Sequence, residues 1–159
     1  MIQPLAATLQ TLRDLPLVVE SYFRSIPLDR LDLRRTVDAW TLREHLYHVA
    51  AVQAMLLGRM TLLRDDPNPV IVPYFPQNEP ALADRYPSVD AAFLEYRVRR
   101  AEQLVLLQAL PPEAWTKPAV HPEYERYDLN LVVHHLVFHE YWHFYRIEEL
   151  WLTRDGYLL

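Results

Sequence analysis

The 159-residue sequence contains no cysteine and only two glycines, Gly58 and Gly156. The lack of cysteine excludes disulfide bonds, cysteine-ligated zinc sites and a cysteine nucleophile. An all-β chain of this length needs many tight turns, and such turns usually require more glycine than this. The sequence therefore predicts an all-α protein. Since 51% of the residues are hydrophobic, we expect one folded domain over residues 1–159.

The sequence also lacks a basic surface and a long apolar run. The formal net charge is −5, and the densest group of arginines, at 97–100, alternates with acidic residues as on a solvated helix face. No stretch approaches the roughly 18 apolar residues of a membrane span. The N-terminal residues do not have the basic start of a signal peptide. We therefore expect a soluble, cytoplasmic protein that binds neither nucleic acid nor a membrane.

Hydrophobic periodicity and helix-capping patterns predict four helices, which together suggest a four-helix bundle. The first covers about residues 4–26 and is interrupted by Pro16. The second begins at Thr41 with the capping-box pattern Thr-x-x-Glu and ends near residue 64, and the fourth covers about 129–152. The third runs from a Ser88 cap to Leu110, with a buried stripe predicted at Ala91, Leu94, Val98, Ala101 and Val105.

The connection between the second and third helices is long and rich in proline. Residues 66–87 contain six prolines, which end one helix and prevent another from forming. A connection of this length is unusual inside a compact domain unless it has a specific role. In helical bundles such a segment often crosses over so that two consecutive helices run parallel.

Six of the seven histidines fall into two short windows, at 44–48 and 134–143. At about 100° per residue, His135, His139 and His143 lie together on the apolar face of the fourth helix. The same reasoning places His48 on the core-facing side of the second helix. His45 flanks His48 there.

Several histidines that face one bundle interior suggest a metal site. A buried polar group without a partner costs about 1–3 kcal/mol, and a divalent cation can bind several neutral imidazoles together. A His-x-x-x-His pair plus one histidine from a facing helix gives three ligands and leaves one position open, as in catalytic sites. Spacing alone does not choose between His135–His139 and His139–His143. The alternative is that these histidines are core residues satisfied by other protein groups.

Two motifs resemble the DinB/YfiT-like superfamily. One is WTLREHLYH at 40–48, and the other is HEYWH at 139–143, approached through a similar stretch from residue 121. The resemblance implies an up-down-down-up four-helix bundle with a long proline-rich crossover between helices 2 and 3. It also implies a metal held by His48, His139 and His143, with His135 as a neighbour. Homodimers are common in the family, so the resemblance implies a homodimer as well.

The metal would provide the reactive group, because the chain has no thiol. It can activate either water, giving hydrolysis, or the thiol of a small cosubstrate, giving S-transfer. The resemblance favours S-transfer, because characterised relatives include thiol-dependent transferases and isomerases. We therefore expect a metal-dependent hydrolase or S-transferase acting on a small molecule, with a non-catalytic metal- or ligand-binding protein as the alternative. Zinc or nickel suits three imidazoles, and iron, cobalt and manganese are further candidates.

The sequence leaves open the roles of three residues near the predicted metal ligands. Many relatives carry glutamine three residues after the second motif histidine, whereas this chain has Arg146. We expect Arg146 to pair with Glu149 rather than with an anionic substrate. Glu44 or His45 could orient His48 through its second ring nitrogen, although the capping box competes for Glu44.

Overall fold

The computed structural model describes residues 5–75 and 81–159, and its main elements are four long helices. They are α1 (Leu5–Phe23), α2 (Leu42–Asp65), α3 (Val89–Gln108) and α4 (Leu129–Leu152). Short 3-10 helices lie between or after them, at Leu28–Arg30, Leu82–Asp84, Pro112–Thr116 and Asp155–Tyr157. Within the described residues there is no β-strand, only an isolated bridge between Val70 and Val120. The predicted all-α four-helix fold is confirmed, while residue 4 of the first predicted helix lies outside the described residues.

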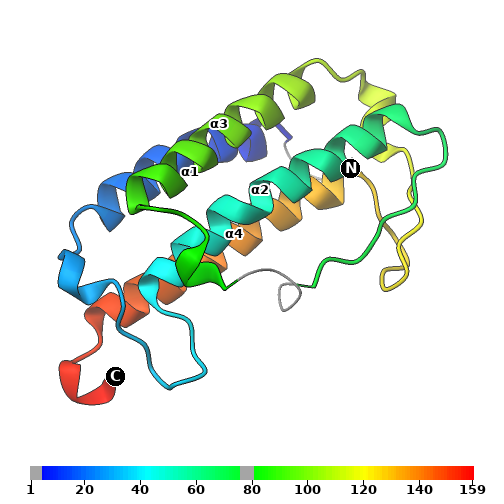
Figure 1. Cartoon of the computed structure of the whole chain (residues 1–159). Helices are drawn as coiled ribbons and strands as arrows, with labels where there is room; N and C mark the ends of the chain where they lie inside the picture. The colour runs from blue at the N-terminus through cyan, green and yellow to red at the C-terminus, as the bar shows by residue number, and fades with distance from the viewer. Residues whose placement is uncertain (1–4, 76–80) are drawn as a thin grey trace.

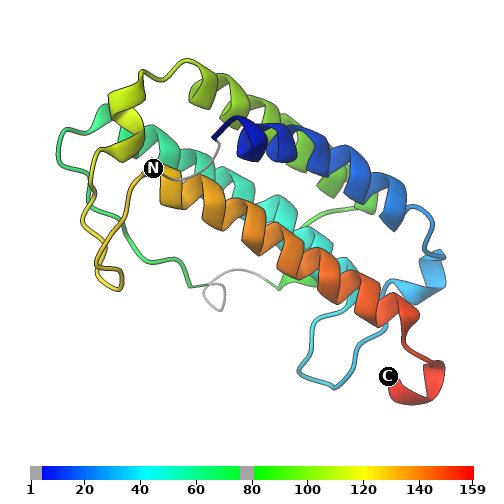
Figure 2. The ribbon, with the colours of Figure 1, turned by 180° about the vertical axis from the view of Figure 1, so that it is seen from behind.

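The four helices pack side by side as a bundle (Figures 1 and 2). Helices α2 and α3 run in the same direction, and α1 and α4 run in the opposite one (Figure 1). Helix α2 packs against both α3 and α4, and α1 packs against the same two helices from the other side. The connection between α2 and α3 includes residues 76–80, which lie outside the described residues.

Side-chain caps define where the helices begin. The hydroxyl of Thr41 accepts a hydrogen bond from the backbone N–H of Glu44, at 3.1 Å, and the Glu44 carboxylate accepts one from the N–H of Thr41, at 2.8 Å. The predicted capping box is therefore confirmed, and it occupies Glu44. Ser88 and Asp128 cap α3 and α4 in a similar way. Pro16 lies inside α1, which continues through it.

Helix α2 is long and apolar enough to cross a membrane, by length and composition only. More than half of its most apolar window is buried inside the bundle, and a buried core helix commonly passes the same test. Its buried side chains include the polar His45, His48 and Gln53.

The buried face of α3 differs from the predicted stripe. Leu94, Val98 and Val105 are exposed, so that prediction is wrong. The residues that are buried instead are Ala92, Phe93, Tyr96, Arg100, Gln103, Leu106 and Leu107. Arg100 is 2% exposed, so it does not lie on a solvated face with Arg97 and Arg99. The physical reason is that the buried face of α3 includes the polar side chains of Tyr96, Arg100 and Gln103, and Arg100 pairs there with a buried carboxylate.

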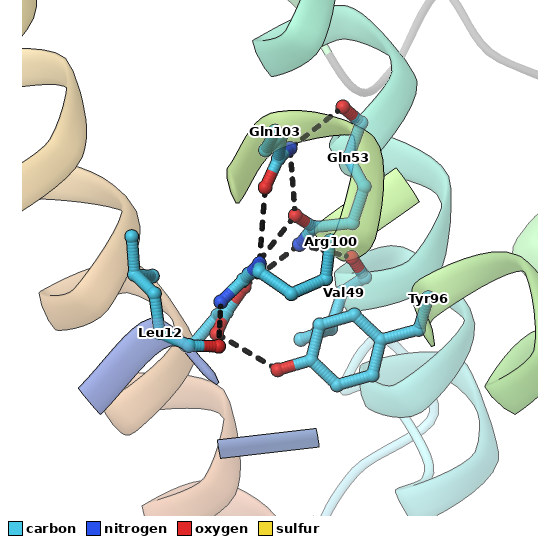
Figure 3. A network of polar contacts seen from close by, with 7 residues as sticks. Leu12, Val49, Gln53, Tyr96, Arg100 and Gln103 are labelled. Atoms are coloured by element: carbon cyan, nitrogen blue, oxygen red, sulfur yellow. Dashed lines mark hydrogen bonds and ion pairs between the residues drawn. The ribbon is translucent and has the colours of Figure 1, made fainter. Parts of the chain in front are cut away.

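That carboxylate belongs to Glu140 of α4, which is fully buried and forms an ion pair with Arg100. The hydroxyl of Tyr96 and the side-chain amide of Gln53 each donate a hydrogen bond to Glu140, both at 2.8 Å. Arg100 also donates to the backbone carbonyl of Leu12 in α1, at 2.9 Å (Figure 3). The network therefore connects all four helices.

The network lies between two apolar clusters along α2, α3 and α4. One cluster contains Ala50, Tyr96 and Ile147, and the other contains Val52 and Leu106. Burial raises the pKa of Glu140, while Arg100 and the hydrogen bonds from Tyr96, Arg100 and Gln53 oppose that shift. Because every partner donates a hydrogen bond to it, Glu140 is an ionised carboxylate in this arrangement.

Candidate metal centre

Helices α2 and α4 bring three histidine side chains to one point. The Nε2 atom of His139 lies 3.1 Å from Nε2 of His48 and 3.2 Å from Nε2 of His143. In a tetrahedral zinc site with Zn–N bonds of about 2.0–2.1 Å, two nitrogen ligands are about 3.3 Å apart. Nε2 of His139 is therefore about as far from each of the other two nitrogens as two ligands of one cation are, and the ligand atoms all lie within 4.8 Å of one another. His48 and His143 are buried, and His139 is partly buried.

Burial keeps these imidazoles neutral. Burial first, and neighbouring histidines second, lower the pKa of His48 to about 4 and that of His139 to about 3. The same causes place the pKa of His143 well below its ordinary value. All three rings are therefore uncharged near pH 7, which is the form that binds metals.

The hydrogen bonding of the three rings fits a cation better than it fits internal satisfaction. The Nδ1 atoms of His48 and His139 are buried without a hydrogen-bond partner whether or not a cation is bound to Nε2, so only the contacts between the Nε2 atoms bear on the cation. A neutral imidazole carries one N–H, so three Nε2 atoms in contact cannot each be paired within the group. A cation at their centre would accept all three lone pairs and leave the proton of each ring on Nδ1.

His45 and Trp40 surround His143. The Nδ1 atom of His45 lies 2.9 Å from Nδ1 of His143, and the Trp40 ring is stacked on the His143 ring with centroids 5.7 Å apart. Of the residues whose roles the sequence leaves open, neither His45 nor Glu44 contacts the second ring nitrogen of His48, because His45 contacts His143 and Glu44 belongs to the capping box. With a metal on Nε2 of His143, its Nδ1–H would donate to His45.

Replacing His45 by alanine is expected to lower metal affinity about tenfold to a hundredfold. The reason is that His143 would lose the acceptor that holds its proton on Nδ1. Competition against a chromophoric chelator measures this affinity. His134→Ala is the matched control, since His134 lies on α4 but bonds the Asn130 carbonyl instead. An unchanged affinity in His45→Ala would contradict the role assigned to His45.

The metal-free protein is expected to lose stability as the pH falls from about 6.5 to about 4. In that range the unfolded chain protonates its histidines, whereas burial holds the pKa of His45 and of His48 at about 4 in the folded chain. Each such group should lower the free energy of unfolding by about 1.4 kcal/mol per pH unit. Urea denaturation at pH 6.5 and pH 5, with chelator present, measures the slope. In His48→Asn the slope should be smaller, and an equal slope would refute this assignment.

A cavity of about 210 Å³ lies beside two of the candidate ligands, His48 and His139. Its lining comes from α2, α4 and the loops around residues 73–74 and 121–127, and comprises His48, Val52, Met55, Leu56, Arg59, Pro73, Tyr74, His121, Glu123, Tyr124, Tyr127, His135 and His139. His135 therefore lies next to the candidate site, with its ring centroid 6.0 Å from that of His139.

A more open groove lies on the other side of the histidines. Trp40, Trp142 and Arg146 line it, together with all three candidate ligands. Arg146 forms an ion pair with Glu149, as the sequence predicted.

Sequence reasoning missed two features near the site. The first is Glu140, which follows His139 directly and is the buried partner of Arg100. Nothing in the motif around His139 predicted that this residue forms an ion pair in the core. Arg59 and His121 lie far apart in the sequence, and only the folded loops bring both to the cavity.

The fold and the histidine cluster together define a helical-bundle protein with a candidate three-histidine metal site. The chain belongs to the DinB superfamily, whose family model matches residues 10–147. Among solved structures it is similar to YfiT from Bacillus subtilis, described as a probable metal-dependent hydrolase with an unusual four-helix bundle topology. The TM-score is 0.80 at 19% identity, covering 91% of this chain and 84% of that one, which shows the shared fold. A search of curated proteins found no match.

Proposed function

We propose that this protein is a metal-dependent enzyme in which His48, His139 and His143 hold one divalent cation. The observation that carries the proposal is the triangle of Nε2 atoms, at 3.1 and 3.2 Å, next to a cavity. The bound cation would supply Lewis-acid activation of water or of a small-molecule thiol. The reaction is then hydrolysis or thiol S-transfer on a small molecule. Zinc and nickel are the first candidates, before iron, cobalt and manganese.

Other side chains around the three histidines pack on the ligands, hold one of them in position or line the substrate cavity. Trp40 packs over the rings of His48 and His143 and lines the groove that all three histidines share. His45 holds His143 in position through Nδ1. The cavity next to His48 and His139 is where a small substrate would bind.

Elemental analysis of protein purified without a histidine tag tests the metal, and about one divalent ion per chain is expected. Esters and amides are then screened with and without glutathione, mycothiol or bacillithiol, before and after chelation. Turnover that needs metal alone indicates a hydrolase, and turnover that also needs a thiol indicates an S-transferase. A metal-loaded protein without any turnover would favour the alternative, a non-catalytic metal- or ligand-binding protein. Protein without metal would refute the site.

We also propose a homodimer, formed through an apolar groove between α1 and α4. Val18, Tyr22, Tyr141 and Tyr145 line this groove and are exposed, which is unusual for a surface without a partner. Sedimentation should show a dimer that Val18→Glu converts to a monomer. Val105→Glu, on the exposed side of α3, is the matched control. A monomeric wild-type chain would refute this arrangement. The cytoplasmic location and the single domain over residues 1–159 stay predictions.

A further inference from the structure

One wall of the cavity follows a single stripe of α2, formed by His48, Val52, Met55 and Arg59. These residues are spaced at i, i+4, i+7 and i+11, so they lie on one face of the helix. At 1.5 Å per residue, the backbone positions of His48 and Arg59 are about 16 Å apart. The wall therefore has a candidate metal ligand at one end, two apolar side chains in the middle and a cation at the other end.

The guanidinium of Arg59 is held without a carboxylate partner among the described residues. One nitrogen, Nη1, donates to the hydroxyl of Tyr127 at 3.2 Å, and Nη2 donates to the carbonyl of Val72 at 2.9 Å. These bonds use two of its five N–H groups. By contrast, Arg100 and Arg146 each have an ion-pair partner.

The positive charge of Arg59 acts on the groups that face it across the cavity. After burial, it is the next cause that lowers the pKa of His121 and of His135. Among the described residues, Glu123 is the one acidic residue that lines the cavity, and it is exposed. The remaining polar groups of the lining are tyrosines and histidines, whose neutral forms carry no charge. Arg59 therefore places a permanent positive charge at this end of the cavity even without a metal.

The loops around Arg59 are connected before any ligand binds. The N–H of Ile71 donates to the carbonyl of Val120 at 2.8 Å, and the N–H of Val120 donates to the carbonyl of Pro69 at 2.9 Å. The ring of His121 stacks on Tyr127 with centroids 4.7 Å apart. These contacts hold Tyr127, and through it Arg59, in place, which reduces the ordering cost of binding.

We propose that Arg59 and Tyr127 form an oxyanion subsite, which binds a carboxylate or phosphate group at the far end of the substrate. The guanidinium is suited to both anions, because its parallel N–H groups match two oxygens. Val52 and Met55 then contact a short apolar middle, and the reacting group lies at the His48 end. The substrate class is an anionic molecule with an apolar linker. This inference rests on the proposed function, since the metal defines the reacting end.

Isothermal titration calorimetry tests the subsite with three probes, hexanoate, hexyl phosphate and 1-hexanol, at fixed ionic strength. Metal-loaded and chelator-treated proteins are both titrated, so that binding to the metal is separated from binding to Arg59. Both anions should bind at least tenfold more tightly than the neutral alcohol. The tighter of the two anions identifies whether carboxylate or phosphate is the preferred group.

Arg59→Met should weaken binding of both anions at least tenfold and leave 1-hexanol within about twofold. Arg59→Lys, which keeps the charge, should retain part of the affinity. The matched control is Arg99→Met, since Arg99 is paired with Glu95 and Glu102 on α3. Circular dichroism verifies that each variant is folded.

Equal anion binding by wild type and folded Arg59→Met would overturn the subsite, and so would loss of anion binding on chelation alone. If the wild-type protein binds the anions but no metal, and Arg59→Met binds the anions more weakly, the proposed enzyme is refuted and the subsite is supported. The two proposals can therefore fail separately.

Discussion

Replacing Glu140 by alanine is expected to lower the free energy of unfolding by about 3–5 kcal/mol. The substitution leaves the guanidinium of Arg100, which is 2% exposed, as a buried charge without its counter-ion. It also removes the acceptor of Tyr96 and Gln53. Since a folded domain is usually stable by only about 5–15 kcal/mol, this is a large part of the total. Urea denaturation in the presence of chelator measures it without a contribution from metal.

A matched control distinguishes the buried pair from ion pairs in general. Glu95→Ala removes the partly exposed partner of Arg99 and should cost less than about 1 kcal/mol. The double variant Glu140→Leu with Arg100→Met should be more stable than Glu140→Ala, because it leaves no unpaired charge in the core. A loss below about 1 kcal/mol in Glu140→Ala would show that the network contributes little.

Replacing His143 by alanine is expected to lower metal affinity at least about a hundredfold, because one of three ligands is lost from a site whose binding free energy is on the order of 10 kcal/mol. His135→Ala should bind metal nearly as wild type does. The two histidines are matched, since each lies four residues from His139 on α4. Of these two histidines, His143 is the one whose Nε2 contacts Nε2 of His139, at 3.2 Å.

Elemental analysis after dialysis and a chelator competition give the metal content and affinity of both variants. His143 is buried against Trp40, so its replacement could unfold the protein. Circular dichroism tests whether unfolding causes the loss of metal. Equal losses in His135→Ala and His143→Ala, or a loss only in His135→Ala, would refute the ligand assignment.

The two predictions concern neighbouring parts of α4. Glu140 follows His139 directly and lies about 100° further around the helix, where it meets Arg100, while His139 meets His48. The buried network thus fixes how α4 is rotated relative to α2 and α3, and that rotation brings the two α4 histidines to His48. A structural ion pair and a candidate metal site therefore depend on the same orientation of α4.

The helices, and the helix faces on which the histidines lie, could be predicted from the amino-acid sequence alone. The capping box at Thr41, the cap at Ser88 and the period of about 3.6 residues depend on neighbours within one turn, so they can be read without a fold. The all-α class, the limits of α4 and the inward side of His48 were predictable for this reason. The exclusion of disulfide bonds and of a cysteine nucleophile likewise follows from composition alone.

Which residues contact each other across helices could not be predicted from the sequence, because these contacts depend on how the helices pack. His135 and His143 lie equally far around α4 from His139, so the choice depends on where α2 crosses α4 and at which height His48 projects. The core side of α3 was predicted incorrectly because a hydrophobic pattern treats Arg100 as exposed, and its partner Glu140 is 40 residues away. The contact of His45 with His143, 98 residues apart, was hidden for the same reason. Local periodicity fixes an angle around one helix axis, whereas packing between helices fixes the distances that make a site.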